Sequence, residues 1–343
     1  MLRSIFKGRE AVFIAEIGIN HNGDVNTALD LVDSAAGIGA DAVKFQTFNP
    51  EKMYSEFTSS LIEGGSESAR SRKEIDFFAK LTLSADDYRV IADRCALRGV
   101  EFFSSPFDAG SVDLLESLGV RLYKIASSEV TDTRLLEAVA ATGKPVIMST
   151  GISTEDEIAQ AVNMLRSGGC PDITLLHCVA LYPAGDADLN LKRIQSLASR
   201  FGCEVGFSDH SADTLPAALA AGFGARVFEK HFMLDGDFEC PDRNVSLTPS
   251  GFSRMMSEVR RAIVMAGDGA LDYSPSEESV ARSARKSIFA ARDIPEGAVI
   301  MDGDLDYRRP GVGIPVYRRP DVIGRRAATM IAKDHLIRWE HLS

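Results

Sequence analysis

Long hydrophobic runs are missing from this chain of 343 residues. No apolar stretch approaches the roughly 18 residues that a membrane-spanning helix requires, so we expect no segment to cross a membrane. The first residues, Met1 to Arg9, lack the apolar core and the small-residue cleavage site of a signal peptide. We therefore expect a cytoplasmic protein.

Closely spaced cysteines are also absent. The five cysteines form no C-x-x-C pair, which predicts reduced, structural thiols and gives no sign of a closed zinc site. Positive charge is scarce, because 38 basic residues face 49 acidic ones and leave a net charge of −11. This balance argues against a nucleic-acid-binding surface. A few local cations can still bind an anionic small molecule inside an acidic protein.

Short β-branched runs alternate with longer segments of helical pattern from residue 11 onward. The strand candidates are 12–17, 42–46, 100–104, 121–126, 145–149, 173–178, 203–207 and 225–230. Segments between them, such as Thr27–Ile38, Asp108–Leu118 and Glu155–Arg166, are amphipathic. Together with a further helix at Ser250–Met265, this order predicts an α/β fold, a (β/α)8 TIM barrel. The alternative is a doubly wound open sheet, but residues 16–23 lack the G-x-G-x-x-G spacing that normally marks one.

The chain changes character near residue 268. Periodicity fades over 268–284, which we expect to be a linker. Residues 285–343 have short strand patterns, Gly/Pro turns and more basic than acidic residues. We predict a barrel domain over 1–267 and a small basic, β-rich domain over 285–343. The polar stretch 48–75 is long enough to be an active-site loop or lid.

Polar residues stand at the carboxyl ends of nearly all the predicted strands, where a barrel places its active site. The candidates are Glu16, Lys44, Gln46, Ser104, Ser105, Lys124, Ser127, Glu129, Ser149, His177, Tyr182, Ser208, His210, Glu229 and His231. Lys44 and Lys124 each sit among apolar neighbours. Two such lysines beside several hydroxyls are typical of a pocket for a phosphate or a phosphate-carboxylate. A Schiff-base lysine is the alternative role.

His210 and His231 end two strands that flank an alanine-rich helical segment. The carboxyl ends of adjacent parallel strands lie about 5 Å apart, so both imidazoles could bind one divalent ion, or each could simply cap its strand. Two protein ligands leave positions for water and substrate, which suits Mn²⁺ or Mg²⁺ as a Lewis acid. Glu16 could contact the ion or a substrate hydroxyl, or pair with Lys44 or Lys124.

A series of motifs runs in order along the chain. They are Glu-Ile-Gly-Ile-Asn-His-Asn-Gly at 16–23, Val-Lys-Phe-Gln-Thr at 43–47, Ser-Ser-Pro-Phe-Asp at 104–108, Tyr-Lys-Ile-Ala-Ser-Ser-Glu at 123–129, Ser-Thr-Gly at 149–151, Leu-His-Cys-Val-Ala-Leu-Tyr-Pro at 176–183, Phe-Ser-Asp-His-Ser at 207–211 and Glu-Lys-His-Phe at 229–232. Together they resemble the sialic acid synthase family, which condenses phosphoenolpyruvate with an N-acylated amino sugar to make nonulosonic acids. The C-terminal stretch resembles the antifreeze-like SAF domain.

The resemblance implies a role for each matching residue. His210 and His231 would bind a divalent metal, Mn²⁺ first and Mg²⁺ or Co²⁺ as further candidates. Phosphoenolpyruvate would be held by Lys44, Lys124, Ser127, Ser149 and Ser208, with Ser105 as a further substrate-binding residue. The sugar would contact Glu16, Gln46, Tyr182 and Asp242. Glu129 would serve proton transfer near the reacting centre, and Arg309 would enter the active site of the other subunit in a domain-swapped homodimer.

Two departures from the family pattern leave the sugar open. Residues 63–70 replace a Gly-Asn segment that helps to bind sugar, and residues 240–246 keep Asp242 without the usual Pro-Gly-Pro-Asp form. The acceptor could be N-acetylmannosamine or a 2,4-diacetamido-trideoxyhexose that leads to legionaminic or pseudaminic acid. The spore-coat polysaccharide branch of the family is also similar. A Schiff-base aldolase of the same barrel class and a non-catalytic carbohydrate-binding protein are the alternative functions.

Overall fold

The computed structural model describes residues 5–6, 8–53 and 69–343. The chain divides into two compact units, Met1–Gly267 and Asp268–Ser343. None of the helices in the described ranges is long and apolar enough to cross a membrane. Most of the predicted loop over 48–75 falls at 54–68, outside the described residues.

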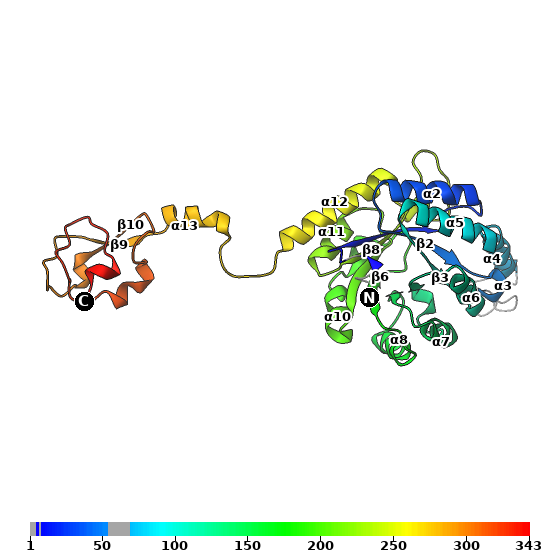
Figure 1. Cartoon of the computed structure of the whole chain (residues 1–343), viewed down its shortest axis with the longest axis horizontal. Coiled ribbons are helices and arrows are strands. Elements are labelled where there is room, and N and C mark those ends of the chain that lie inside the picture. Colours follow the sequence, from blue (N-terminus) through cyan, green and yellow to red (C-terminus); the bar gives the residue numbers. More distant parts are fainter. Residues whose placement is uncertain (1–4, 7, 54–68) are drawn as a thin grey trace. The chain divides into compact units, whose positions relative to one another are not determined.

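Eight parallel strands make up the centre of the first unit (Figure 1). Hydrogen-bonded neighbours follow the order β3-β2-β1-β8-β7-β6-β5-β4. The strands are β1 Val12–Gly18, β2 Ala42–Thr47, β3 Glu101–Pro106, β4 Tyr123–Ile125, β5 Val146–Ser149, β6 Ile173–Cys178, β7 Glu204–Asp209 and β8 Val227–His231. Because β3 also lies against β4, the sheet curls round into a barrel. The predicted TIM-barrel fold is confirmed, and the open-sheet alternative is excluded.

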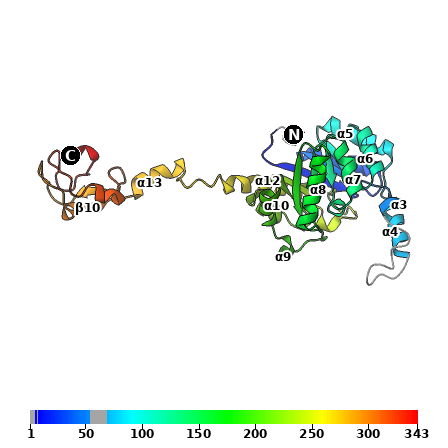
Figure 2. The same cartoon turned by 90° about the horizontal axis from the view of Figure 1, so that it is seen from below.

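Helices connect the strands and surround the barrel (Figures 1 and 2). They are α2 Val25–Gly37, α3 Pro50–Met53, α4 Ala69–Ala79, α5 Ala85–Arg98, α6 Ala109–Ser117, α7 Thr133–Ala141, α8 Glu155–Ser167, α9 Asp186–Leu189, α10 Arg193–Phe201, α11 Leu215–Gly222 and α12 Pro249–Ala266. The four helical ranges predicted from periodicity correspond to α2, α6, α8 and α12. The predicted loop over 48–75 is interrupted by α3 and the start of α4, because Ile75 is buried and Phe78 packs on Phe48.

The interior of the barrel has two levels, because alternate residues of a barrel strand point inward. Near the amino ends of the strands the inward residues form a separate apolar cluster, the apolar tier: Phe6, Val12, Ile14, Ala42, Phe103, Leu122, Ile147, Leu176 and Val227. Two positions further along each strand stands the polar tier: Glu16, Lys44, Ser105, Lys124, Ser149, Cys178, Ser208 and Glu229. The register pairs Glu16 with both Lys44 and His231. The alternation along the strands therefore places apolar side chains toward the amino ends of the strands and polar, ionisable side chains toward their carboxyl ends.

The second unit has its own small core. It contains the helix α13 Glu278–Ala284 and the antiparallel pair β9 Ser287–Ala290 and β10 Leu305–Arg308. Isolated bridges such as Ile294 to Ile331 add further antiparallel contacts. Its buried residues are Ile288, Ala290, Ile294, Ile300, Leu305, Ile314, Val322, Ala327, Ile331, Ile337 and Leu342. This is the small β-rich fold expected for the end of the chain, whereas the linker assigned to 268–284 stays a prediction.

Candidate active site at the barrel mouth

A cavity of about 270 Å³ lies over the polar tier at the carboxyl ends of the strands. The predicted site residues that line it are Glu16, Lys44, Gln46, Ser105, Lys124, Ser127, Ser149, Tyr182, Ser208, His210 and His231. They come from strands spread over the whole barrel and over more than 200 positions of sequence. The convergence predicted from the strand ends is therefore present in the structure.

Lys44 is paired at the floor of this cavity. Its Nζ lies 2.7 Å from Oε2 of Glu16 and donates a hydrogen bond of 3.2 Å to Oγ of Ser105. The amide of Gln46 donates to the other Glu16 oxygen, Oε1, at 3.1 Å. A lysine, a carboxyl and two neutral hydrogen-bonding groups from the first three strands thus form one network.

Lys124 forms a second network on the opposite strands. Its Nζ donates to Oγ of Ser149 at 2.7 Å and to the carbonyl oxygen of Ile125 at 2.9 Å. Glu229 stands between the two lysines, with one carboxylate oxygen 3.9 Å from each Nζ. Its Oε1 accepts from Ser208 at 2.9 Å, and among the described residues its Oε2 has no hydrogen-bond partner. The floor therefore holds two buried ammonium groups. Some of the polar atoms around them make no hydrogen bond to the described part of the protein.

Burial and neighbouring charge shift the pKa values of these groups. Burial raises the pKa of Glu16 from 4.5 to about 7, against the opposing effect of Lys44. Burial and the neighbouring ammonium of Lys44 lower the pKa of Lys124. Burial works against the charge on Glu229, but the two lysines outweigh it and lower the pKa of that carboxyl. Because a pKa of about 7 leaves Glu16 only partly ionised at neutral pH, the two lysines outweigh the carboxylates there, and the floor has a surplus of positive charge, which favours an anion.

His210 and His231 meet beside this floor, with ring centroids 5.4 Å apart. Both Nε2 atoms face the hydroxyl oxygen of Tyr182, at 3.0 Å for His210 and 3.5 Å for His231. Nδ1 of His210 lies 2.8 Å from the carbonyl oxygen of Val179. If Nδ1 donates its proton there, Nε2 keeps its lone pair toward the cavity.

Both imidazoles of the histidine pair would have to be neutral to bind a divalent ion. Burial lowers the pKa of His231 well below its ordinary value, so this imidazole is neutral and has a free lone pair. Its Nδ1 lies 3.3 Å from Oδ2 of Asp242 without hydrogen-bond alignment. Burial opposes charge on His210 as well, but the Cys178 thiol and the Val179 carbonyl raise its pKa. Within the described residues, no group of three or more His, Cys, Asp or Glu side chains is arranged to hold a metal ion. An ion bound by this pair would therefore need water or substrate as further ligands.

Three residues to which the resemblance assigns a role do not line the cavity. Glu129 lies in a short 3-10 helix, Ser127–Glu129, and burial raises the pKa of its half-buried carboxyl. Asp242 stands behind His231, and its backbone N–H donates to Oδ1 of Asn20 at 3.1 Å. Arg309 follows β10 in the second unit. The roles assigned to these residues stay predictions.

The structure also corrects two details of the strand ends. His177 points away from the cavity, because its Nε2 bonds the carbonyl oxygen of Leu189 at 2.6 Å. The next residue, Cys178, lines the cavity instead, with Sγ 3.7 Å from Nδ1 of His210. Alternation of inward and outward residues along β6 could have predicted this, because Cys178 lies two positions after the inward residue Leu176. Glu229, noticed at its strand end but given no role in binding, is central to the floor.

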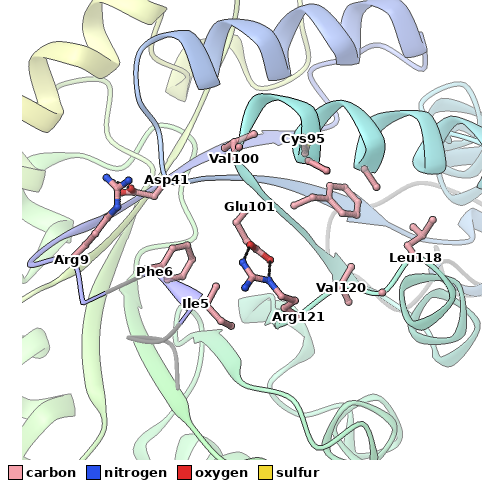
Figure 3. A pocket seen from close by; sticks show the side chains of 15 residues that line it. Ile5, Phe6, Arg9, Asp41, Cys95, Val100, Glu101, Leu118, Val120 and Arg121 are labelled. Carbon is pink, nitrogen blue, oxygen red and sulfur yellow. Dashed lines mark hydrogen bonds and ion pairs between the residues drawn. The ribbon is translucent and has the colours of Figure 1, made fainter.

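A second and larger cavity, of about 450 Å³, lies at the amino ends of the strands (Figure 3). Its charged residues are paired with one another: Arg9 reaches Asp41 at 2.6 Å, and Arg121 contacts the carboxylate of Glu101. The remaining wall is mostly apolar, with Phe6 on one side. This cavity is larger than the one at the barrel mouth, but the two buried lysines and the histidine pair belong to the smaller one. We therefore place the candidate active site at the barrel mouth.

Comparison with known proteins identifies the family. The model of the NeuB family matches residues 31–270, and the model of the SAF domain matches residues 285–343. The chain belongs to the NeuB family. The N,N'-diacetyllegionaminic acid synthase of Campylobacter jejuni is 36% identical over 332 residues, covering 96% of this chain and 99% of that protein. The pseudaminic acid synthase of the same organism is 35% identical over 324 residues, 93% of each chain.

A solved structure of a NeuB-type enzyme has the same fold. The N-acetylneuraminic acid synthetase from Leptospira borgpetersenii, crystallised with citrate, superposes with a TM-score of 0.71 at 32% identity, over 79% of this chain and 90% of that one. These relatives are synthases of nonulosonic acids. The resemblance read from the strand-end motifs is confirmed at the level of the family.

Proposed function

We propose that this NeuB-family protein is a nonulosonic acid synthase that condenses phosphoenolpyruvate with an N-acylated amino sugar and releases phosphate. The observation that carries the proposal is the pair of buried ammonium groups, Lys44 and Lys124, at the floor of a cavity that also holds two convergent imidazoles. The names of the related enzymes support the same reaction class.

Phosphoenolpyruvate would occupy the floor. The two lysines supply charge, and the hydroxyl groups of Ser105, Ser127, Ser149 and Ser208 supply directed donors around them. Glu229 partly neutralises both lysines in the free protein, so an incoming anion competes with a carboxylate that is already in place. The surplus of positive charge that remains because Glu16 is only partly ionised favours the anion in this competition.

The amino sugar would lie nearer the opening. Glu16, Gln46, Tyr182 and Asp242 would contact it, and Glu129 would serve proton transfer. His210 and His231 would hold a divalent ion, Mn²⁺ first and Mg²⁺ or Co²⁺ as further candidates, which when bound supplies a Lewis acid for the sugar aldehyde. C3 of phosphoenolpyruvate forms a bond to the aldehyde carbon, water adds at C2, and the C–O bond to phosphate breaks.

Arg309 would act in the other subunit of a domain-swapped homodimer, on the N-acyl side of the sugar. Replacing Arg309 with alanine should lower kcat/KM for the sugar. The value of kcat/KM for phosphoenolpyruvate, measured at saturating sugar, should change less. Arg308→Ala is the matched control, because Arg308 is already paired with Asp306 and Asp334. Equal activities of the two variants would remove Arg309 from the site. The dimer and the cytoplasmic location stay predictions.

Phosphate release from phosphoenolpyruvate, measured over a panel of N-acylated hexosamines with mass spectrometry of the products, tests the reaction. If none of the acceptors in the panel supports phosphate release, the proposed reaction is refuted. Borohydride trapping of a lysine adduct with pyruvate would instead support the aldolase, and sugar binding by the second unit without turnover would support a binding protein.

The metal site has a separate test. His210→Ala should abolish binding of Mn²⁺, followed by electron paramagnetic resonance of the free ion. His335→Ala is the control, since His335 is exposed in the second unit. Unchanged Mn²⁺ affinity in the His210 variant would take this residue out of the metal site.

A further inference from the structure

A buried ion pair stands next to the two histidines in sequence, on the outer side of the barrel wall. Lys230 lies between Glu229 and His231 on β8, and because these two neighbours line the cavity, its side chain points to the opposite face of the strand. Its Nζ lies 3.2 Å from Oδ2 of Asp209 on β7, and the two side chains are 0% and 2% exposed. The proposed reaction uses neither group.

Lys230 also holds the backbone that carries His210. The pairing of β7 with β8 ends at Asp209 and Lys230, so His210 is the first residue beyond the hydrogen-bonded ladder. Nζ of Lys230 donates to the backbone carbonyl oxygen of Ser211 and, at 3.4 Å, to its Oγ. The backbone N–H of Ser211 donates to Oδ1 of Asp209 at 2.8 Å. The turn over 209–211, with His210 at its centre, is therefore tied to β8 by the lysine side chain.

The other backbone contacts of this turn come from the opposite side. The carbonyl oxygen of His210 accepts from the backbone N–H of Ala184, and its Nδ1 lies 2.8 Å from the carbonyl oxygen of Val179. Both partners follow β6, whereas Lys230 directly precedes His231 on β8. The lysine thus connects the backbone of one histidine to the strand that ends in the other, and the 5.4 Å between the two ring centroids depends on this connection.

Stability alone does not account for an ammonium group at this position. The cost of removing both charges from water offsets much of their attraction, and apolar residues of similar volume often stabilise a fold as well as a buried ion pair does. Apolar side chains could fill the same space between β7 and β8. They could not supply a directed bond to the carbonyl oxygen of Ser211, two residues past the end of the ladder.

We propose that Lys230 is a positioning residue that sets the separation and orientation of His210 and His231, so that both imidazoles reach one divalent ion. The inference rests on the metal site of the proposed function and adds to it a group that touches neither the ion nor the substrates. Residues that hold metal ligands in place typically contribute about 10-fold to 100-fold to metal affinity.

The affinity for Mn²⁺, measured by electron paramagnetic resonance of the free ion without substrates, tests the inference. Lys230→Met should weaken Mn²⁺ binding by about 10-fold to 100-fold. It should also lower the thermal midpoint, because Asp209 is left buried without its cation. With Mn²⁺ at saturation, KM for phosphoenolpyruvate should be unchanged, because the lysine side chain faces away from the cavity.

Two further variants separate positioning from stability. Lys230→Met combined with Asp209→Asn removes both charges and keeps the Oδ1 acceptor for Ser211. This double variant should recover most of the thermal midpoint and still bind Mn²⁺ weakly. Asp41→Ala is the matched control, because Asp41 is a buried carboxyl that accepts from the backbone N–H of Phe13 at 2.8 Å near the amino ends of the strands. It should lower the midpoint and leave Mn²⁺ affinity unchanged.

The outcomes separate the inference from the function on which it rests. A double variant that binds Mn²⁺ as tightly as the wild type would overturn the role of Lys230, and so would an equal loss of affinity in Asp41→Ala. A wild type that binds no Mn²⁺ would overturn the metal site and this inference, with the condensation still open to the phosphate assay. Weak Mn²⁺ binding in the Lys230 variants alone, without phosphate release from any acceptor, would support the inference and refute the proposed reaction.

Discussion

Replacing Lys124 with methionine should separate two roles that a buried lysine combines in this site. The substitution keeps most of the length and the apolar character of the stem and removes the charge. The lost partners are Oγ of Ser149 at 2.7 Å, the carbonyl oxygen of Ile125 at 2.9 Å and the carboxylate of Glu229 at 3.9 Å. Two unit charges at that separation attract by about 4 kcal/mol at an effective dielectric constant of about 20.

The expected loss of stability is smaller than this attraction. Methionine avoids the cost of burying an ammonium group, and Glu229 keeps Lys44 at 3.9 Å as a second partner. Removing one member of a buried pair typically costs about 3–5 kcal/mol, so we expect the lower end, about 3 kcal/mol. In a unit of this size that lowers the thermal midpoint by about 6–12 °C. The double variant Lys124→Met, Glu229→Gln removes both members of the pair, leaves Lys44 with Glu16 at 2.7 Å, and should recover most of the midpoint.

Activity should not recover with stability. An ammonium group paired with a desolvated anion contributes on the order of 2–5 kcal/mol, which corresponds to roughly 30-fold to 4,000-fold in kcat/KM for phosphoenolpyruvate. We expect both variants to lose activity in this range, as measured by initial rates of phosphate release. A double variant that folds like the wild type and also turns over like it would refute the assignment of Lys124 to the anion site.

Three further predictions follow from individual contacts. Ser105→Ala should raise KM for phosphoenolpyruvate several-fold, because Ser105 bonds Lys44 inside the cavity, whereas the control Ser104→Ala should leave KM unchanged, since Ser104 bonds Thr47 outside it. Burial raises the pKa of Glu16 to about 7 in the folded state, against 4.5 for the free group. Between pH 4.5 and pH 7 the folded state therefore keeps a proton on Glu16 that the unfolded state has released. Wild-type stability should therefore decrease by up to about 3 kcal/mol relative to Glu16→Gln as the pH rises from 4.5 to 7 and then level off, and parallel pH profiles of the two thermal midpoints would contradict this. Ile152→Gly should raise the thermal midpoint, because glycine adopts a φ of 48° without strain; a lower midpoint would show that the backbone there is not strained.

The floor of the site could be predicted from sequence because it follows from periodicity. A residue two positions beyond an inward apolar residue also points inward, so Lys44 follows Ala42 and Lys124 follows Leu122. The register between parallel strands then places these residues at one level. No tertiary information beyond the order of the strands was needed for this step.

The choice between His177 and Cys178 was harder to predict. Sequence patterns locate a strand to within a residue or two, and a shift of one residue exchanges the inner and outer faces. His177 has the chemistry of a site residue, but β6 turns it outward. Lys230 shows the same limit, since it faces away from the cavity and pairs with Asp209 at 3.2 Å. Its charge could be found in the sequence, whereas its orientation required the coordinates.

Among the described residues, the apolar tier packs below the lysines and separates the cavity at the barrel mouth from the amino ends of the strands. Both substrates of the proposed reaction would then enter the cavity from the barrel mouth. The substrate that binds at the floor would have to bind before the one nearer the opening. Initial-rate kinetics should accordingly be ordered, with the enol phosphate binding ahead of the sugar.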